Sequence, residues 1–422
     1  MSHGRTLAEK ILARSSCSER IKPGDVITAR VSLATAHDAC GKIVEPFTRM
    51  GGGRVWDRNK IAISLDHYVP AQSESAAELH KMTREFVRKQ GIQKFYDIGR
   101  GGVCHQVVAE KSLVKPGMLV VGTDSHTTTL GAFGAFATGI GVTEMAAVFK
   151  TGRIWLKCPE NVRMEFTGKK PVHVSGKDFI LFAIGRLGTS CAIYKAIEFG
   201  GGAVERLPFS DIMTMTNLSV ELGAKTGLVA ADITAKNIGC ENDKSVRKWT
   251  SDRDASFQIE YHFDISALEP QVACPPSLNN VHPISDIAKK KIRINQVFIG
   301  SCTNGRIEDL RIAAKILRGE VIHKDVRMII APASWNIYRQ AKQEGLIDIF
   351  TDAEAAVVNP GCSACFGGHT GILAKGESCL STGNRNFTGR MGAADSSVYI
   401  ASPAVAAATA LFGEITDPGD VL

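Results

Sequence analysis

Three cysteines most constrain how this chain can fold, because each stands where a strand is predicted to end. Residues 300–305 (GSCTNG) contain Cys302, and residues 359–365 (NPGCSAC) contain Cys362 and Cys365. Each motif follows a short apolar run, and the chain between them alternates helical and strand-like patterns. This β-α-β-α-β order predicts that all three thiols meet at the carboxyl edge of a parallel sheet.

Three thiolates without an obvious fourth ligand suit an iron–sulfur cluster better than structural zinc, which takes four protein ligands. A cluster held by three cysteines leaves one iron open, and an open iron acts as a Lewis acid. On spacing alone, an equal alternative is a redox dithiol formed by Cys362 and Cys365, with Cys302 as a small buried residue. A structural zinc protein that binds a partner also stays open.

Composition narrows the class of protein. The eleven cysteines are an odd number without a disulfide framework, so we expect a reducing, cytoplasmic location. The N-terminus has no apolar signal core, and no apolar run has membrane-spanning length, so no membrane partner is expected. The formal charge of +7 is modest for 422 residues and includes no long basic block, so nucleic acid is not an expected partner.

Polar residues follow other predicted strands in the first part of the chain. They are His37, the pair Asp66-His67, His105 and the triplet Asp124-Ser125-His126. A carboxylate beside an imidazole fixes the ring and raises its basicity, which suits a group that holds a proton. The triplet is not a hydrolase relay, because three consecutive residues cannot adopt that geometry and no G-x-S-x-G turn is present.

A glycine-flanked loop beyond the cysteines carries Asn384, Arg385 and Arg390. The planar guanidinium donates two parallel hydrogen bonds to a carboxylate. Two arginines beside a Lewis-acidic iron therefore predict a substrate with two or three carboxylates. An electron-transfer or redox-sensing iron–sulfur protein is the alternative from another class, and these arginines and the missing fourth thiolate argue against it.

In order and spacing, the two cysteine motifs and the arginine loop resemble those of the aconitase superfamily, and the resemblance covers nearly the whole chain. It implies a hydro-lyase that dehydrates and rehydrates a small 2-hydroxy di- or tricarboxylate. It implies a 4Fe-4S cluster on Cys302, Cys362 and Cys365, with one iron not ligated by cysteine. The implied catalytic residues are Asp66, His67, His105, Asp124, His126 and Glu221, with His105 paired to Glu221. The implied substrate-binding residues are His37, Ser125, Asn217, Asn384, Arg385 and Arg390.

The resemblance also implies the architecture, an α/β fold of three aconitase-like domains with parallel sheets around a central cluster site. Changes of composition place the domains at residues 1–158, 159–283 and 284–422, the last carrying the cluster cysteines. The family's fourth, swivelling domain, which carries a serine base, is expected to be lacking. We therefore expect a small partner subunit that supplies this domain and the catalytic base, as in the two-subunit dehydratases of the superfamily. Residues 39–41 depart from the family pattern, which leaves the exact substrate open.

Overall fold

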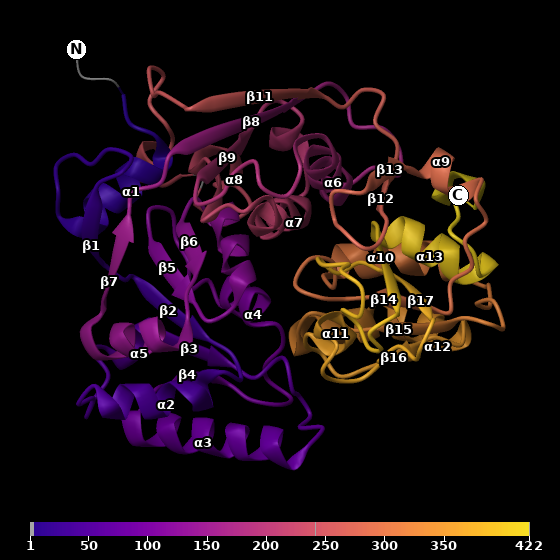
Figure 1. Cartoon of the computed structure of the whole chain (residues 1–422), viewed down its shortest axis with the longest axis horizontal. Coiled ribbons are helices and arrows are strands. Elements are labelled where there is room, and N and C mark those ends of the chain that lie inside the picture. Colours follow the sequence, from indigo (N-terminus) through magenta and orange to yellow (C-terminus); the bar gives the residue numbers. More distant parts are fainter. Residues whose placement is uncertain (1–3, 241, 422) are drawn as a thin grey trace.

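The computed structural model describes residues 4–240 and 242–421, which form three α/β parts, each built on its own sheet (Figure 1). The first sheet is parallel, with the order β4-β3-β2-β5-β6. Its strands are β2 (Leu33–Ala36), β3 (Ile61–Ser64), β4 (Lys94–Tyr96), β5 (Leu119–Gly122) and β6 (Phe136–Gly139). Strands β2, β3 and β5 are buried along their whole length, as expected where both faces of a parallel sheet are covered.

Helices cover this sheet, and an antiparallel pair lies beside it. The helices are α1 (Leu7–Ser16), α2 (Cys40–Arg49), α3 (Glu74–Gln90), α4 (Cys104–Glu110) and α5 (Val142–Thr151). Helix α2 packs against both α3 and α5. Strand β1 (Val26–Arg30) pairs with β7 (Arg153–Lys157). None of the helices in the described residues is long and apolar enough to cross a membrane.

The second sheet is also parallel and has the order β10-β9-β8-β11. It consists of β8 (Asn161–Thr167), β9 (Ala196–Gly200), β10 (Thr226–Val229) and β11 (Ile259–Asp264), with helices α6 (Gly176–Leu187), α7 (Phe209–Leu218) and α8 (Ala231–Thr234). Phe166 stacks on Phe179 and Phe263 at ring-centroid distances of 5.4 and 5.0 Å. These aromatic contacts join β8, α6 and β11 into one core.

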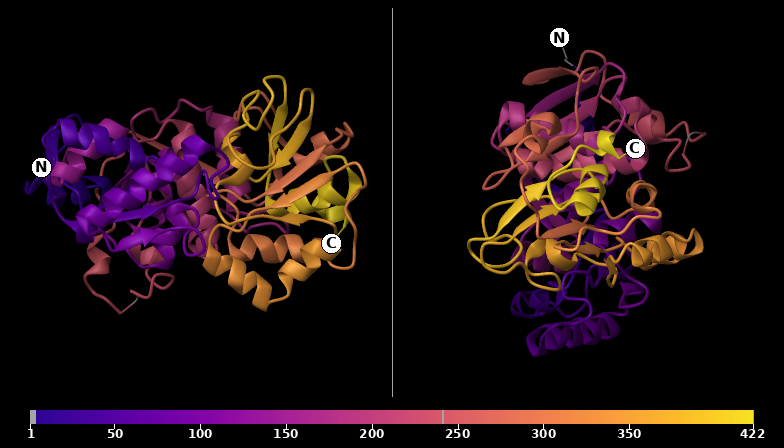
Figure 2. Two further views of the ribbon diagram at one scale, coloured as in Figure 1. Left: turned by 90° about the horizontal axis from the view of Figure 1, so that it is seen from below. Right: turned by 90° about the vertical axis from the view of Figure 1, so that its right-hand side faces the viewer.

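The third sheet has the order β13-β12-β18-β17-β14-β15-β16 and lies beside the first two parts (Figures 1 and 2). Its strands are β12 (Gln271–Ala273), β13 (Val281–Pro283), β14 (Gln296–Ile299), β15 (Arg327–Ile330), β16 (Ala356–Val357), β17 (Ser378–Ser381) and β18 (Ser397–Ile400). Its helices are α9 (Ile284–Ala288), α10 (Ile307–Leu317), α11 (Trp335–Gln343), α12 (Leu346–Asp352) and α13 (Pro403–Phe412). The parallel order β14-β15-β16 confirms the predicted β-α-β-α-β unit.

One predicted boundary does not match the sheets. The proline-rich segment before residue 284 reads in the sequence as a linker, but residues 275–280 form the loop of an antiparallel hairpin between β12 and β13. Strand β12 pairs with β18 through Ala273 and Ile400. The third sheet therefore begins before the predicted start of the third domain.

The first and second parts meet where Gly131 lies against β10. A Cβ atom at Gly131 would overlap the carbonyl oxygen of Gly227. The 3₁₀-helical segment Ser125–Phe133, which carries Gly131, can approach the strand this closely only without a side chain. This contact places the end of β5 next to the second part.

We predict that Gly131→Ala lowers the free energy of unfolding by about 3 kcal/mol, because the added methyl group forces the two backbones apart. Gly53→Ala is the matched control, since open space surrounds that position. Thermal unfolding followed by circular dichroism compares the two variants. Equal melting temperatures for both would contradict the close packing described above.

Candidate active site

The three predicted cysteines are brought together beyond β14, β16 and β17. The side-chain amide of Asn384 donates to the Cys302 sulfur at 3.3 Å, and its oxygen lies 3.5 Å from the Cys365 sulfur. The Cys362 and Cys365 thiols share a hydrogen bond. Asn384, predicted to bind substrate, thus lies between two of the three sulfurs.

Burial raises the pKa of the Cys302 thiol to about 12. The hydrogen bond from Cys362 holds the pKa of Cys365 well below its ordinary range, and that of Cys362 is raised. Without a metal, Cys302 is therefore protonated at neutral pH. A soft metal would deprotonate a coordinating thiol outright, because its charge dominates the local electrostatics.

The surroundings of these thiols fit a sulfur-ligated metal group. A Cβ at Gly383 would lie 3.3 Å from the Cys365 sulfur, so glycine keeps this side of the sulfur clear. The oxygen Oδ1 of Asn217 is buried and has no hydrogen-bond partner among the described residues. Three thiols and the clear space beside one of them suit an iron–sulfur cluster better than an empty core.

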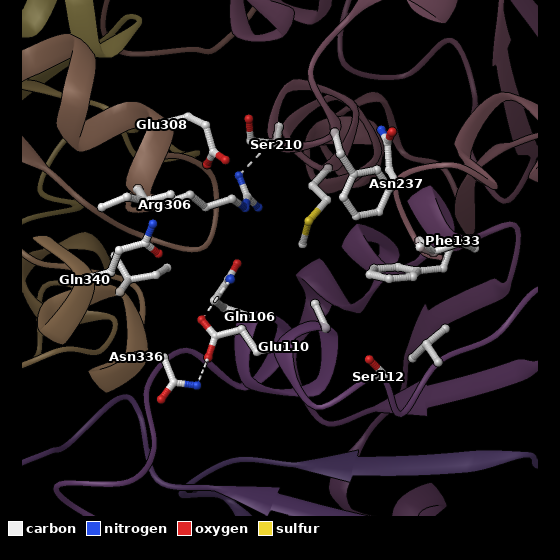
Figure 3. A pocket seen from close by; sticks show the side chains of 17 residues that line it. Gln106, Glu110, Ser112, Phe133, Ser210, Asn237, Arg306, Glu308, Asn336 and Gln340 are labelled. Atoms are coloured by element: carbon white, nitrogen blue, oxygen red, sulfur yellow. Dashed lines mark hydrogen bonds between the residues drawn. The ribbon is translucent and has the colours of Figure 1, made fainter. Parts of the chain in front are cut away.

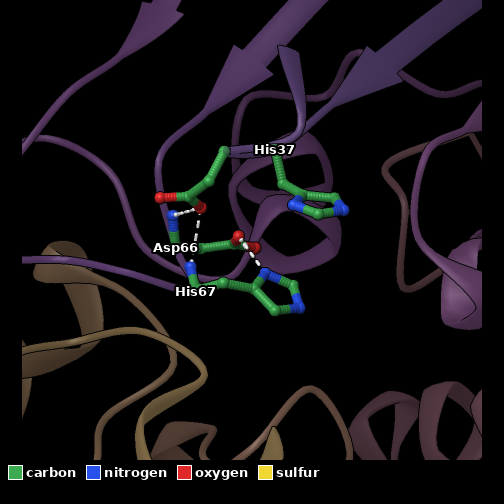
Figure 4. Close-up of side chains that lie close together, drawn as sticks. His37, Asp66 and His67 are labelled. Atoms are coloured by element: carbon green, nitrogen blue, oxygen red, sulfur yellow. Dashed lines mark hydrogen bonds and ion pairs between the residues drawn. The ribbon is translucent and has the colours of Figure 1, made fainter. Parts of the chain in front are cut away.

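A loop of the first part is joined to the cysteine loop. The amide of Cys362 donates to the carbonyl oxygen of Asp66 at 2.8 Å. The Asp66 carboxylate accepts from the Cys104 amide at 2.7 Å and lies 2.6 Å from Nδ1 of His67. The rings of His37 and His67 stack at 4.3 Å, and Figure 4 shows both beside Asp66. The structure thus brings these predicted residues together.

Two residues that support this loop are absent from the predicted set. The buried carboxylate of Asp38 accepts from the amides of Asp66 and His67 at 2.8 and 2.7 Å, and from Nε2 of His80 at 2.6 Å. His80 comes from α3, where it is buried. A histidine on the buried face of an amphipathic helix is a signal that could have identified it.

Asp124 is the centre of a second set of polar contacts. Its Oδ1 lies 3.0 Å from Nε2 of His105 and accepts from the amide of His126 at 2.7 Å, and its Oδ2 lies 3.5 Å from Nε2 of His67. The predicted pairing of His105 with Glu221 is wrong, because the first turn of α4 directs His105 towards Asp124. Nε2 of His126 lies 2.9 Å from Glu221 Oε1 instead.

The predicted arginines lie at the entrance to this region. Arg385 donates from Nε to Glu221 Oε1 at 2.8 Å and from Nη2 to Ser125 Oγ at 3.1 Å. Glu221, Arg385 and Arg390 line one cavity of about 530 Å³. The Nε of Arg390 has no partner among the described residues. The arginines are therefore positioned to bind carboxylates that enter the cavity.

Two histidines of the site, His67 and His126, favour their protonated forms, whereas burial and the charge of His67 lower the pKa of His37. Burial lowers the pKa of His67, but the charges of Asp66, Asp124 and Asp38 outweigh it and raise the pKa to about 10. The pKa of His126 is raised in the same way, since Asp124 and Glu221 outweigh its burial. Burial raises the pKa of Asp124, yet the bonds from His105 and His126 hold it well below its usual range. At neutral pH the site therefore contains imidazolium ions held by carboxylates.

A further cationic side chain, Arg306, supports the cysteine loop and was not predicted. Its Nη2 donates to the carbonyl oxygen of Cys302 at 2.8 Å, and its Nη1 donates to Thr214 Oγ1 at 3.2 Å. Arg306 also lines a second cavity, of about 510 Å³, with Gln106 and Glu110 (Figure 3). The lining of that cavity contains none of the three cysteines, so it is separate from the site.

Comparison with known proteins gives a consistent result. Residues 9–413 match the model of the aconitase family (aconitate hydratase). The 3-isopropylmalate dehydratase large subunit 1 of Methanopyrus kandleri is 50% identical over 98% of this chain and 99% of its own. The probable methanogen homoaconitase large subunit of Methanothermobacter thermautotrophicus is 46% identical over 98% of this chain and 97% of its own. The crystal structure of Thermococcus kodakaraensis aconitase X (holo-form) is similar in fold, with a TM-score of 0.51, 13% identity and coverage of 85% and 84% of the two chains.

We predict that Asp66→Asn lowers the pKa of His67 from about 10, because the main charge that opposes burial is lost while Asp124 and Asp38 remain. In the wild type, the raised pKa makes a stabilising contribution that is complete below about pH 6.5 and is lost as pH rises towards 10. Histidine ¹³C–¹H NMR, with His67→Asn to assign the signal, measures both midpoints. An unchanged midpoint in Asp66→Asn would refute the assigned cause.

Proposed function

This chain belongs to the aconitase family, and we propose that it is the large subunit of a hydro-lyase that converts 2-isopropylmalate to 3-isopropylmalate by dehydration and rehydration. This reaction belongs to leucine biosynthesis. The observation that carries the proposal is the meeting of three thiols, two carboxylate–imidazolium pairs and two arginines at one site. Homoaconitate is the alternative substrate, since one relative is named for it, and a 2,3-dimethylmalate-type dehydration is the third.

The wall of the arginine cavity favours isopropylmalate over homoaconitate. Besides Glu221 and the arginines, the cavity is lined by the apolar residues Val220, Pro276, Leu278 and Phe387 and by the polar residues Thr189, Ser277 and Asn386. The apolar part of this wall beside the arginines suits a dicarboxylate with an isopropyl group, whereas an additional carboxylate would lose its hydration there.

We propose that Cys302, Cys362 and Cys365 hold a 4Fe-4S cluster with one iron not ligated by cysteine. When bound, such a cluster supplies a Lewis acid that makes hydroxide a better leaving group. Asn384 positions two of the sulfurs through its amide. The remaining steps depend on side chains of this chain and of its partner.

The arginines bind and the imidazolium ions move protons. Arg385 and Arg390 hold the substrate carboxylates, and Ser125, which Arg385 contacts, hydrogen-bonds to the same substrate. His67, held by Asp66, delivers a proton to the departing hydroxyl group from Nε2, since Asp66 occupies its Nδ1. On rehydration the same nitrogen takes a proton from water.

We propose that a small partner subunit supplies the base that removes the proton from carbon. The carboxylates of this site already accept hydrogen bonds from imidazoles or Arg385, which weakens them as bases. The relatives are named as large subunits, which supports the existence of a small one. No disulfide joins any of the eleven cysteines, all of which lie in the described residues, and this supports a reducing compartment such as the cytoplasm.

The decisive experiment measures iron and acid-labile sulfide in protein purified without oxygen. We predict about four irons and four sulfides per wild-type chain. Cys302→Ser should lose most of the iron, because hard oxygen replaces a soft ligand. Cys17→Ser is the matched control, since Cys17 is exposed and lies outside the site. Zinc without sulfide in the wild type would refute the proposal.

Activity then requires co-expression with the candidate small subunit and assays on 2-isopropylmalate, homocitrate and 2,3-dimethylmalate. We expect a preference for 2-isopropylmalate. A cluster that can be reduced reversibly, without hydro-lyase activity on any of these acids in the complex, would instead favour an electron-transfer or redox-sensing protein.

We predict that Arg385→Lys lowers kcat/KM about 10- to 100-fold, because lysine keeps the charge but loses the planar fork that contacts Glu221, Ser125 and substrate. Steady-state kinetics of the complex test this. The exposed Arg318→Lys serves as control and should match the wild type. Equal kcat/KM values for both variants would remove Arg385 from the substrate site.

A further inference from the structure

A lysine from the second part of the molecule reaches into the loops around the cysteines. Lys177 is the second residue of α6, and its side chain is 0% exposed. Its Nζ donates to the carbonyl oxygens of Thr382 and Gly383 at 2.6 and 2.5 Å and to Oδ1 of Asn304 at 3.1 Å. Asn304 stands two residues after Cys302, and Gly383 directly precedes Asn384. One ammonium group therefore ties together both loops that contact the sulfurs.

The charge of Lys177 is unpaired within the described residues. All three of its acceptors are neutral, and no carboxylate forms an ion pair with it. The neighbouring Asp178 is engaged elsewhere, by Ser175 and by the amide of Gln271. Burial without a counter-ion lowers the pKa of Lys177 to about 7, which reflects the cost of keeping the charge here. Hydrogen bonding alone does not explain why a cation occupies this position.

The negative groups that act on Lys177 include two of the cysteines. Those that favour its charged form are, in order, Asp309, the sulfurs of Cys365 and Cys302, and Asp178. Asp309 is itself occupied by the Asn304 side chain and the Arg306 amide. The thiolates become permanent anions only when metal holds them, and a 4Fe-4S group bound by three thiolates carries a net negative charge.

We propose that Lys177 is the buried counter-charge of the thiolate-bound cluster, so that it sets the reduction potential of the cluster as well as positioning the two loops. The inference rests on the proposed function, because it requires the cluster. Lys177 does not touch the sulfurs in the structure and acts through the loops and through its charge. It is a positioning residue, and its charge is the property to be tested.

Two variants separate charge from hydrogen bonding. Lys177→Met removes both, whereas Lys177→Gln keeps an N–H donor without the charge. Lys10→Met is the matched control, because Lys10 is a half-buried lysine. It pairs with Asp252, and both residues are distant in sequence from the three cysteines. Each full-length chain is loaded with iron and sulfide without oxygen, and the cluster potential is measured by a redox titration monitored by electron paramagnetic resonance.

We expect a more negative reduction potential in both Lys177 variants, because reduction adds an electron next to a lost positive charge. We also expect cluster loss in air to be about tenfold faster, as for other residues that support metal ligands. Lys10→Met should match the wild type in both measurements.

Two results would overturn the inference. If the reduction potential of the cluster in Lys177→Gln equals that of the wild type, Lys177 only connects the two loops by hydrogen bonds and its charge has no effect. If both Lys177 variants fail to fold without the cluster, as judged by thermal unfolding of the metal-free chains, the role of Lys177 is structural. A wild-type chain that takes up no iron and sulfide would refute the proposed function itself, and that result is seen before any variant is measured.

Discussion

Buried carboxylates that accept backbone N–H groups at the ends of parallel strands hold this structure together. A strand that ends at the sheet edge leaves amides without a partner in the sheet, and buried amides must be satisfied. Asp38 accepts from two such amides in the Asp66-His67 loop, Asp66 accepts from Cys104, and Asp124 accepts from His126. Burial alone would raise the pKa of Asp38 and Asp124, but the imidazole of His80 for Asp38 and those of His105 and His126 for Asp124 hold it below its ordinary range. The backbone amides fix the loops, and the imidazoles fix the charge.

The same carboxylates determine which protons the site holds. Asp66 and Asp124 each accept from a backbone amide and also bind an imidazole. Glu221 binds an imidazole and Arg385. Arg385 and Arg390 line the cavity together with Glu221, whereas the imidazoles do not belong to its lining. An anionic substrate that enters the cavity therefore meets the two arginines, one of which is paired with Glu221.

The sequence allowed the meeting of the three cysteines to be predicted because the signal is local. Cys302 and the 362–365 pair follow strands whose apolar pattern and helical connections are legible over short distances. The partner of Glu221 could not be predicted in this way. His105 and His126 both follow strands, and only the packing of α4 against Asp124 decides that His126 contacts Glu221. The hairpin of β12 and β13 was misread for a related reason, because its pairing with β18 is distant in sequence.

Lys177 shows where local patterns stop being informative. At the start of α6 it resembles any lysine near a helix end, and lysine is rarely buried without a partner. Its position is intelligible only after the second and third parts have been docked, because its acceptors lie more than 120 residues further along the chain. Arg306, the N-cap residue of α10, supports the Cys302 loop from within the third part and also reaches Thr214 of α7. A site at the meeting point of three sheets is thus positioned by strand ends, which the sequence reveals, and supported by buried cations, Lys177 from the second part and Arg306 from the third. A buried cation whose acceptors are neutral, as those of Lys177 are, has a physical reason only where negative charge lies nearby.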